Sequence, residues 1–350
     1  MEPLNRNDLN KILIVGFGSM GKKYAQIIRK HFPEITIGIL SSQKIHNLKA
    51  NYATNDEDII WFESIDEAID FSPDAAIFSN PASMHIESAF PFANEGVNLL
   101  IEKPISTTYK RAKELVSLCE EKNIILMTGY NLRYLPSLIH FRSLLIDGRI
   151  GDIYSVNCEA GSFLPNWRQG ADYRQTVSAQ ESLGGGVLFE LSHELDYIQW
   201  IFGNITWIIA RSSKQSKLEI DVEDTCNMIL GIQGTTDNNE LIASVNLDFI
   251  RHNATRTCLA IGSKGSLSWC GIKGVIKYFP MNGNSWEIIY SKTEDLFSTY
   301  IEEVRYFFDS IVSNTQPLVD GREGLKTLGI IKAAKESSKS GKIIIPSDDN

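Results

Sequence analysis

Short apolar runs alternate with amphipathic segments along the first 130 residues. The apolar runs contain almost no polar residue, which is typical of strands buried on both faces of a parallel sheet. The segments between them carry apolar positions at helical spacing. This alternation predicts an α/β domain built on a doubly wound parallel sheet. The expected strands are 11–15, 35–40, 75–78, 97–101 and 124–127, and the expected helices are 21–30, 66–70, one through Ala89 and Phe92, and 111–121.

The pattern changes after about residue 150, where strand-like runs follow one another across short turns. One long helix over 187–202 interrupts them, and further helices are expected at 300–311 and 321–337. A run of consecutive strands predicts a large, mostly antiparallel sheet in an α+β domain. The expected strands are 153–160, 205–210, 225–231, 241–249, 256–262, 265–270 and 275–279. We therefore expect domains at 1–130 and 131–350, with the last helix and a short strand at 342–345 packing back toward the first domain.

Composition limits the partners that the protein is expected to have. The 350 residues are 43% hydrophobic and carry 34 Lys and Arg against 43 Asp and Glu, a net charge of −9. Such a surface repels phosphate backbones and anionic lipids, so we expect neither nucleic acid nor a membrane as partner. The five cysteines include no Cys-x-x-Cys pair. They predict reduced thiols in a cytoplasmic protein, with no metal site.

A glycine-rich loop follows the first predicted strand. Its sequence is Gly16-Phe17-Gly18-Ser19-Met20-Gly21, and it opens the first predicted helix. In this context the first glycine permits a tight turn, the second lets a pyrophosphate approach the backbone, and the third lets the helix pack closely on the strand. The loop predicts a dinucleotide-binding Rossmann domain at 1–130. The residues expected to contact the cofactor here are Gly16, Gly18, Ser19, Met20 and Gly21.

The end of the second strand bears on the choice of cofactor. An NAD enzyme usually carries an acid there that binds the adenosine ribose. This chain has Ser41, Ser42 and Lys44 instead. Hydroxyls and a cation suit a 2′-phosphate, so the expected cofactor is NAD(P) with a preference for NADP, and NAD stays open because Lys44 is equally compatible with a solvated surface position.

Four further segments carry a resemblance to a known family. They are Ser79-Asn80-Pro81-Ala82-Ser83-Met84-His85, Glu102-Lys103-Pro104, Gly184-Gly185-Gly186 and His193-Glu194-Leu195-Asp196. With the glycine loop, they resemble the Gfo/Idh/MocA family (glucose–fructose oxidoreductase / inositol dehydrogenase-like) over essentially the whole chain. The resemblance implies a Rossmann domain followed by an α+β domain for substrate binding and oligomerisation.

The resemblance implies that Lys103 is the catalytic lysine, in a segment that often has a cis bond before its proline. A lysine just past a strand's carboxyl end points into the ligand crevice of such a sheet, where its ammonium can stabilise an alkoxide. The alternative is a surface lysine paired with Glu102. The further residues expected to bind the cofactor are Asn80, Pro81, His85, Glu102, Lys103 and Asn131.

A second group of candidate catalytic residues lies on the predicted helix over 187–202. There His193 is the expected base, with Glu190 or Asp196 as the acid that orients it, because residues three apart share a helix face. Many family members have an Asp four residues before this histidine, whereas Glu190 stands three before it. A structural role for the helical histidine is the alternative.

A narrower resemblance concerns the substrate. The segment 164–200 is similar to a subgroup found with bacterial surface-sugar pathways, including nonulosonic acids such as legionaminic acid. Trp167 and Tyr173 offer rings to a sugar face, and Arg168 and Arg174 could hold a carboxylate or phosphate. Packing of this loop is an equally good interpretation.

We therefore expect an NAD(P)-dependent oxidoreductase that moves a hydride between nicotinamide and a carbohydrate hydroxyl or keto carbon. The expected substrate is an amino or acidic sugar, with a nucleotide-linked sugar of bacterial surface-glycan biosynthesis as one form. The alternatives are an inositol- or glucose-type polyol dehydrogenase and a non-catalytic NAD(P)-sensing regulator. Family members commonly pair through the second sheet, so we expect a homodimer or homotetramer.

Overall fold

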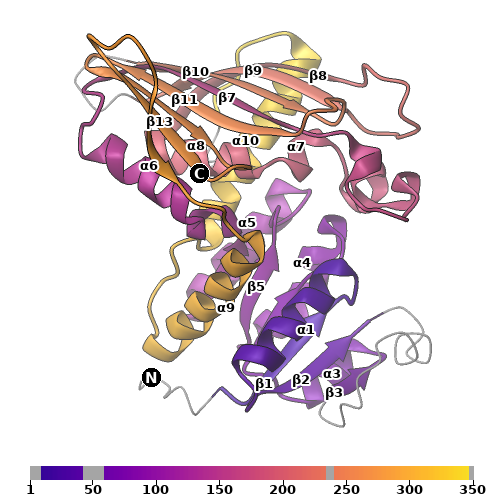
Figure 1. The fold of residues 1–350 in the computed structure, drawn as a ribbon. Helices are drawn as coiled ribbons and strands as arrows, with labels where there is room; N and C mark the ends of the chain where they lie inside the picture. Colours follow the sequence, from indigo (N-terminus) through magenta and orange to yellow (C-terminus); the bar gives the residue numbers. More distant parts are fainter. Residues whose placement is uncertain (1–8, 42–58, 234–239, 347–350) are drawn as a thin grey trace. The chain divides into compact units, whose positions relative to one another are not determined.

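The computed structural model describes residues 9–41, 59–233 and 240–346 (Figure 1). The chain forms two compact units. Unit 1 contains the described residues up to Tyr130 together with Phe297–Leu328. Unit 2 contains Asn131–Leu296 and the described residues from Gly329 onward. The segment Phe297–Leu328 therefore belongs to unit 1, whereas the domains expected from the sequence place it in the second domain, 131–350.

Unit 1 is built on a parallel six-stranded sheet in the order β3-β2-β1-β4-β5-β6. Its central strands are apolar and buried, as the sequence predicts for a sheet covered on both faces. The sequence did not predict β3, which lies at the edge of this sheet. The strands are β1 (Lys11–Val15), β2 (Thr36–Leu40), β3 (Ile59–Phe62), β4 (Ala75–Phe78), β5 (Asn98–Glu102) and β6 (Leu126–Gly129).

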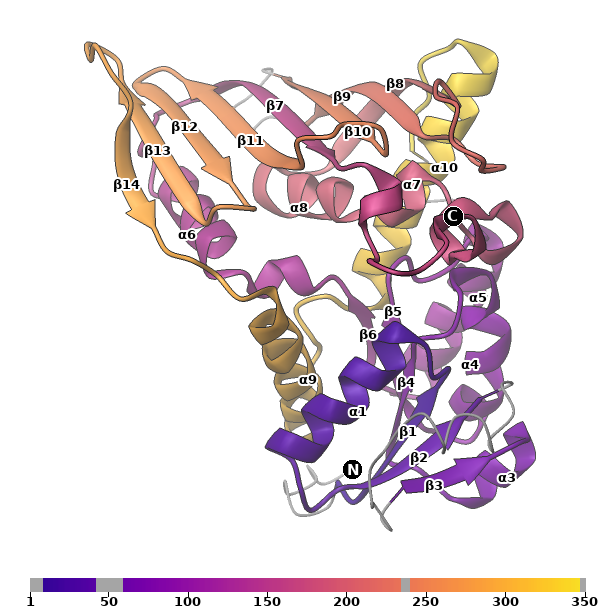
Figure 2. The ribbon, with the colours of Figure 1, turned by 45° about the vertical axis from the view of Figure 1, so that its right-hand side comes forward.

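Helices cover both faces of this sheet. Helices α1 (Ser19–His31) and α9 (Leu296–Ser313) lie side by side on one face, with Tyr24 against Tyr300 and Phe32 against Phe308 (Figure 2). Helices α4 (His85–Asn94) and α5 (Tyr109–Glu121) pack together on the other face. A short helix, α3 (Ile65–Asp70), packs on β2 and β3.

Unit 2 is built on an eight-stranded sheet in the order β14-β13-β12-β11-β7-β10-β9-β8. All neighbouring strands are antiparallel except β7 and β10, which run parallel. The predicted fold class is therefore confirmed for both sheets. The strands are β7 (Ile153–Gly161), β8 (Ile205–Ser213), β9 (Thr225–Ile232), β10 (Leu241–Asp248), β11 (Thr255–Gly262), β12 (Gly265–Cys270), β13 (Val275–Pro280) and β14 (Glu287–Ser291), of which β14 was not predicted.

One face of the second sheet carries the helices of unit 2. Helix α6 (Pro136–Ile146), which the sequence did not predict, packs on β12 and β13. The single helix expected over 187–202 is wrong, because the structure has α7 (Val187–Glu190) and α8 (His193–Phe202) instead (Figure 2). Leu191 leaves the helical region, with φ −98° and ψ 29°. The helix therefore stops there and starts again at His193.

The end of the chain also differs from the prediction. Helix α10 (Gly321–Ser340) contributes its first residues to unit 1 and the rest to unit 2. The strand expected at 342–345 is a single bridge, in which Ile344 exchanges two hydrogen bonds of 2.8 Å with Ile208 of β8 in unit 2. Within the described ranges, no helix is long and apolar enough to cross a membrane.

Candidate active site

The first position of the loop accepts only glycine, because of its backbone conformation and because Asn80 lies close to it. Gly16 directly follows β1 with φ +89°, a conformation that L side chains rarely adopt. A Cβ atom there would lie 2.6 Å from the backbone nitrogen of Asn80. The Gly16 amide donates to the carbonyl oxygen of Leu40 at 2.8 Å, so the loop is tied to the ends of both β2 and β4.

The other two glycines differ from each other in their surroundings. A Cβ on Gly21 would lie 2.1 Å from the Gly16 carbonyl oxygen, so this position fixes the contact between α1 and the loop. A Cβ on Gly18 would have no described atom within 4 Å. Gly18 is the N-cap of α1, and no described side chain caps that end. The first turn contains no acid, whereas the last turn carries Arg29, Lys30 and His31. The N-terminus of α1 therefore fits an approaching pyrophosphate, through free amides and the positive end of the helix dipole.

Three adjacent strands bring their carboxyl ends to this edge of the sheet. The loop follows β1, Ser79 and Asn80 follow β4, and Lys103 follows β5. The order 2-1-4 makes the position between β1 and β4 the point where the direction of the strand crossovers reverses, which is where such sheets bind ligands. The Ser79 hydroxyl donates to the Gly16 carbonyl at 2.9 Å. The cofactor candidates that follow β1, β4 and β5 thus lie at one edge of the sheet, with Pro81 as the N-cap of the short turn after Asn80.

His85 is buried and links the loops after β4 and β5. Its Nε2 lies 2.8 Å from the Asn80 carbonyl oxygen, and its Nδ1 lies 3.0 Å from the Pro104 carbonyl oxygen. The two carbonyls favour the charged ring, but burial opposes them more strongly and lowers the pKa of His85 to about 4. The ring is therefore neutral at pH 7 and donates to one carbonyl at a time. We infer that it positions these loops.

The Glu-Lys-Pro segment has the backbone that the resemblance implies. The peptide bond between Lys103 and Pro104 is cis. The Lys103 amide donates to Glu102 Oε2 at 3.1 Å, and the Glu102 side chain is buried. Lys103 itself is half-buried at the end of β5. Ser41 is buried directly after β2, whereas Ser42 and Lys44 lie outside the described residues.

In unit 2, the break between α7 and α8 determines where the second group of candidates lies. Glu190 ends α7 and His193 begins α8, so they are not three residues apart on one continuous helix. The expected placement of Glu190 and His193 on one helix face is therefore wrong. Asp196 accepts hydrogen bonds from Arg133 Nε at 3.0 Å and Nη2 at 2.7 Å, and both side chains are 1% exposed. Asp196 therefore forms a buried, bidentate ion pair with Arg133.

Arg133 belongs to a short turn, Asn131–Tyr134, that follows β6. Asn131 is buried at the first position of this turn. Asn131 was expected at the cofactor from the sequence, whereas Arg133 was not among the expected site residues. The signal available was an arginine in an otherwise apolar stretch, Leu132-Arg133-Tyr134-Leu135, but only the structure shows which acid balances its charge.

Of the four predicted substrate residues, Tyr173 and Arg174 make polar contacts within the protein. Arg174 is paired with Asp172 at 2.9 Å and with Glu219 at 3.2 Å, so its charge is already balanced. The Tyr173 hydroxyl accepts from the Glu219 amide. These contacts favour the packing interpretation for Tyr173 and Arg174.

Trp167 and Arg168 lie in the same loop, on a short turn after β7. The Trp167 indole donates to the Ser162 carbonyl at 3.2 Å and packs edge-on against Phe249. Arg168 is exposed and makes no ion pair within the parts of the chain that the structure describes. Both residues line a small depression with Tyr173, Thr176 and Ser178. Arg168 is therefore the arginine that is available to an anionic ligand.

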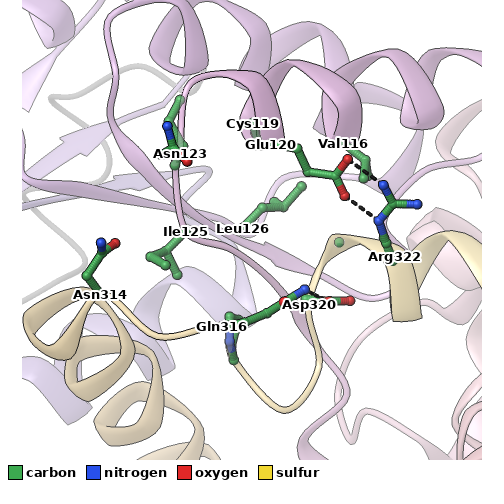
Figure 3. Close-up of a pocket in the computed structure, with 13 residues that line it drawn as sticks. Val116, Cys119, Glu120, Asn123, Ile125, Leu126, Asn314, Gln316, Asp320 and Arg322 are labelled. Atoms are coloured by element: carbon green, nitrogen blue, oxygen red, sulfur yellow. Dashed lines mark hydrogen bonds and ion pairs between the residues drawn. The ribbon is translucent and has the colours of Figure 1, made fainter.

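A separate cavity of about 350 Å³ lies elsewhere in unit 1 (Figure 3). Its walls come from the end of α5, the start of β6 and the connection between α9 and α10. Leu126, which lines it, pairs with Leu99 in the first half of β5, away from the strand end that carries Lys103. Its Glu120 and Arg322 form an ion pair with each other, as Figure 3 shows. None of the predicted site residues lines this cavity.

Comparison with protein families agrees with this geometry. Residues 10–130 match a family described as an oxidoreductase family with an NAD-binding Rossmann fold, and residues 139–268 match the GFO/IDH/MocA C-terminal domain. The chain belongs to the Gfo/Idh/MocA family. The resemblance noted in the sequence is confirmed, as is the cofactor class of the first domain at the level of the family description.

One curated relative with a named reaction is similar to this chain at low identity. The chain is 25% identical over 199 residues to 2,7-anhydro-N-acetylneuraminate hydratase of Mediterraneibacter gnavus, covering 55% of this chain and 49% of that protein. The chain spans about half the length of the first curated relatives that it matches.

Solved structures share the fold along nearly the full length. Levoglucosan dehydrogenase in complex with NADH has a TM-score of 0.82 at 19% identity, covering 97% of this chain and 99% of that one. The WlbA dehydrogenase of Bordetella pertussis, in complex with NADH and UDP-GlcNAcA, has a TM-score of 0.78 at 21% identity, covering 96% and 98%. At these identities the similarity establishes a common fold.

Proposed function

We propose that this protein is an NAD(P)-dependent oxidoreductase acting on a carbohydrate CH–OH or keto carbon. The observation that carries the proposal is the edge of the first sheet. There a glycine loop with an uncapped helix N-terminus, the Asn80 segment and Lys103 follow three adjacent strands. In a dehydrogenase such a loop would bind the cofactor pyrophosphate and the lysine would contact the substrate oxygen. Membership of an oxidoreductase family supports this class of enzyme.

In this proposal the nicotinamide, when bound, accepts or donates the hydride. Gly18 and the first turn of α1 hold the pyrophosphate through backbone amides, and Gly16 makes the turn that precedes them. Lys103 donates a hydrogen bond to the substrate oxygen and stabilises the negative charge that develops on it as the C–H bond breaks. His193 takes the hydroxyl proton. Of the two acids, Glu190 is the better candidate to orient His193, because Asp196 is bound by Arg133.

We propose an acidic or amino sugar as substrate, with a nucleotide-linked sugar of bacterial surface-glycan biosynthesis as the favoured form. Arg168 supports an anionic group on that substrate because it is exposed and has no described acid beside it. The chain is similar to the anhydro-neuraminate hydratase, and it shares its fold with the WlbA dehydrogenase, whose structure contains UDP-GlcNAcA. Both similarities support a sugar substrate.

We propose NADP as the preferred cofactor, on the sequence Ser41-Ser42-Gln43-Lys44 after β2. A fluorescence titration of the purified protein with NADPH and NADH tests this choice. Tighter binding of NADPH supports it, and tighter binding of NADH means that the serines hydrogen-bond an unmodified ribose.

We propose that two copies of the chain pair through the second sheet. The face opposite α6 and α7 exposes isoleucines on β8, β9, β10 and β11, namely Ile209, Ile229, Ile242 and Ile261, which are 37–43% exposed. Exposed apolar side chains gathered on one sheet face mark an interaction surface, and a second copy fits it because the family members commonly pair there.

Two variants test the reaction, each with a matched control. Lys103→Met should lower kcat about 100-fold or more, since it removes the stabilising charge. Lys110→Met, an exposed lysine at the start of α5, is its control. Arg168→Ala should raise KM about ten-fold for an acidic sugar and leave a neutral sugar unaffected. Arg322→Ala is its control.

The outcomes separate the proposal from its alternatives. Turnover of neutral polyols with no effect of Arg168→Ala would indicate a polyol dehydrogenase. Tight cofactor binding without turnover of any sugar, unchanged by Lys103→Met, would indicate an NAD(P)-sensing regulator.

A further inference from the structure

A buried group of acidic and phenolic side chains lies directly behind Lys103. It comes from three elements of unit 1: Tyr24 on α1, Glu102 at the end of β5, and Glu303 on α9. Tyr24 and Glu303 are 0% exposed and Glu102 is 8% exposed. The Tyr24 Oη atom lies 2.7 Å from Glu102 Oε1 and 2.9 Å from Glu303 Oε2.

The proton count of this group requires one carboxyl to be protonated. A tyrosine hydroxyl has one proton to donate, so it can satisfy only one of two ionised carboxylates. The other carboxylate oxygen would then face the hydroxyl oxygen at less than 3 Å without a proton between them. Two adjacent buried charges of the same sign would also repel each other. Both contacts are favourable only when one carboxyl donates to Tyr24 and Tyr24 donates to the other.

The surroundings indicate which carboxyl holds the proton. The second oxygen of Glu102 accepts from the backbone amide of Lys103 at 3.1 Å, and the Lys103 ammonium lies close enough to favour the ionised form of Glu102. Glu303 Oε1 is buried and has no hydrogen-bond partner among the described residues. An ionised oxygen without a partner is much more costly to bury than the carbonyl oxygen of a neutral acid.

We propose that Glu303 is a protonated positioning residue that holds Lys103 through a hydrogen-bond chain. The Glu303 carboxyl donates to Tyr24, Tyr24 donates to the Glu102 carboxylate, and Glu102 accepts from the Lys103 backbone amide. The chain joins α9, α1 and β5, so it ties the helix behind the glycine loop to the lysine segment. The part that concerns Lys103 rests on the proposed function, whereas the proton on Glu303 does not.

Electrostatics agrees with this assignment. Burial raises the pKa of Glu303 well above its usual value, and the nearby Glu102 raises it further. Burial also raises the pKa of Glu102, but the Tyr24 hydroxyl and the Lys103 charge act against that shift. The other groups facing the cluster are Lys23, whose ammonium lies 3.8 Å from the centre of the Tyr300 ring, and Tyr300 itself. The Lys23 charge favours both ionised carboxylates and lowers the pKa of Glu303 less than burial raises it.

The first experiment tests the proton. Apparent Tm is measured from pH 5 to pH 9 for the wild type, Glu303→Gln, Glu102→Gln and the control Glu302→Gln, an exposed neighbour on α9. A neutral acid in the folded state loses stability as the pH rises above its unfolded pKa toward its folded pKa. Glutamine does not titrate, so the Tm of Glu303→Gln should rise relative to the wild type as the pH rises. Parallel curves, or the same divergence in Glu102→Gln instead, would overturn the assignment.

The second experiment tests positioning with steady-state kinetics. Glu303→Leu removes the donor at similar volume and should lower kcat about ten-fold with little change in cofactor affinity. Glu303→Gln, whose amide can donate to Tyr24, should restore most of that loss. Equal kcat values in Glu303→Leu and the wild type, or equal losses in the leucine and glutamine variants, would overturn the positioning role. If neither the wild type nor Glu302→Gln turns over a sugar, the proposed function fails. The Tm experiment then still tests whether Glu303 is protonated in the folded state.

Discussion

Replacing each of two glycines in the loop by alanine is expected to have opposite consequences. The same methyl group is added in both variants. At Gly18 it would have no described atom within 4 Å, and the backbone there is extended, with φ −78° and ψ −155°. Alanine adopts that conformation without strain. At Gly21 the methyl carbon would lie 2.1 Å from the Gly16 carbonyl oxygen and 2.9 Å from the Ser79 hydroxyl oxygen.

The magnitudes follow from these distances. Carbon and carbonyl oxygen approach to about 3.3 Å at closest, so α1 must move by about 1 Å in Gly21→Ala. Overpacking of this size typically costs about 1–3 kcal/mol, which lowers Tm by about 2–4 °C per kcal/mol in a unit of this size. Gly18→Ala should change stability by less than about 0.5 kcal/mol. It should weaken NAD(P)H binding at least about ten-fold, because the methyl group occupies the space where the pyrophosphate approaches.

Thermal melting and a fluorescence titration with NADH and NADPH measure both effects on the same samples. Each variant is the control for the other, since both add one methyl group to one loop. Wild-type cofactor affinity in Gly18→Ala would refute the assignment of this loop to the pyrophosphate. An unchanged Tm in Gly21→Ala would refute the close contact between α1 and the loop.

Three further predictions concern other parts of the molecule. Burial lowers the pKa of His85 from 6.5 to about 4, so its neutral form contributes stability that is complete above pH 6.5 and is lost as the pH falls toward 4. The Tm advantage of the wild type over His85→Gln should therefore shrink across that window, by the equivalent of about 3 kcal/mol, and a constant advantage would contradict the burial argument. Asp196→Asn leaves the buried Arg133 charge unbalanced and should cost about 3–5 kcal/mol in calorimetry, whereas an unchanged Tm would leave a purely catalytic role for Asp196. Ile229→Lys puts a charge beside Ile209 on the exposed sheet face and should shift sedimentation toward the monomer; an unaltered oligomer would place the interface elsewhere.

Much of unit 1 could be predicted because its signals are local. The buried strand before Gly16 and the helix after it are visible as an apolar run, a glycine pattern and helical spacing. Lys103 could be placed at a strand end because it directly follows the apolar run of β5. The edge strands β3 and β14 were missed. Strand β3 is only four residues long, and an apolar run that short does not distinguish a strand from other buried segments. Strand β14 begins and ends on the polar residues Glu287 and Ser291 and is largely exposed, so it has no buried apolar run.

The second group of candidates shows where local reasoning fails. Spacing placed Glu190, His193 and Asp196 on one helix, but only His193 and Asp196 share α8, since Glu190 ends α7. No residue between Val187 and Phe202 is a strong helix breaker that would have predicted this break. Asp172 lies between Arg168 and Arg174 in the sequence, and the structure pairs it with Arg174, which also pairs with Glu219. Glu219 lies 45 residues from Arg174, so no local pattern could reveal that pair.

The sequence by itself determined the fold class, the glycine loop and the position of Lys103, because each depends on residues that are neighbours in the chain. Only the tertiary structure decided which charges are balanced. Tyr24 and Glu303 are 279 residues apart, and Arg133 and Asp196 are 63 residues apart. Burial makes such pairs energetically decisive, since a charge removed from water must find its partner within the fold. The proton on Glu303 and the partner of Asp196 therefore follow from packing that no window of the sequence contains.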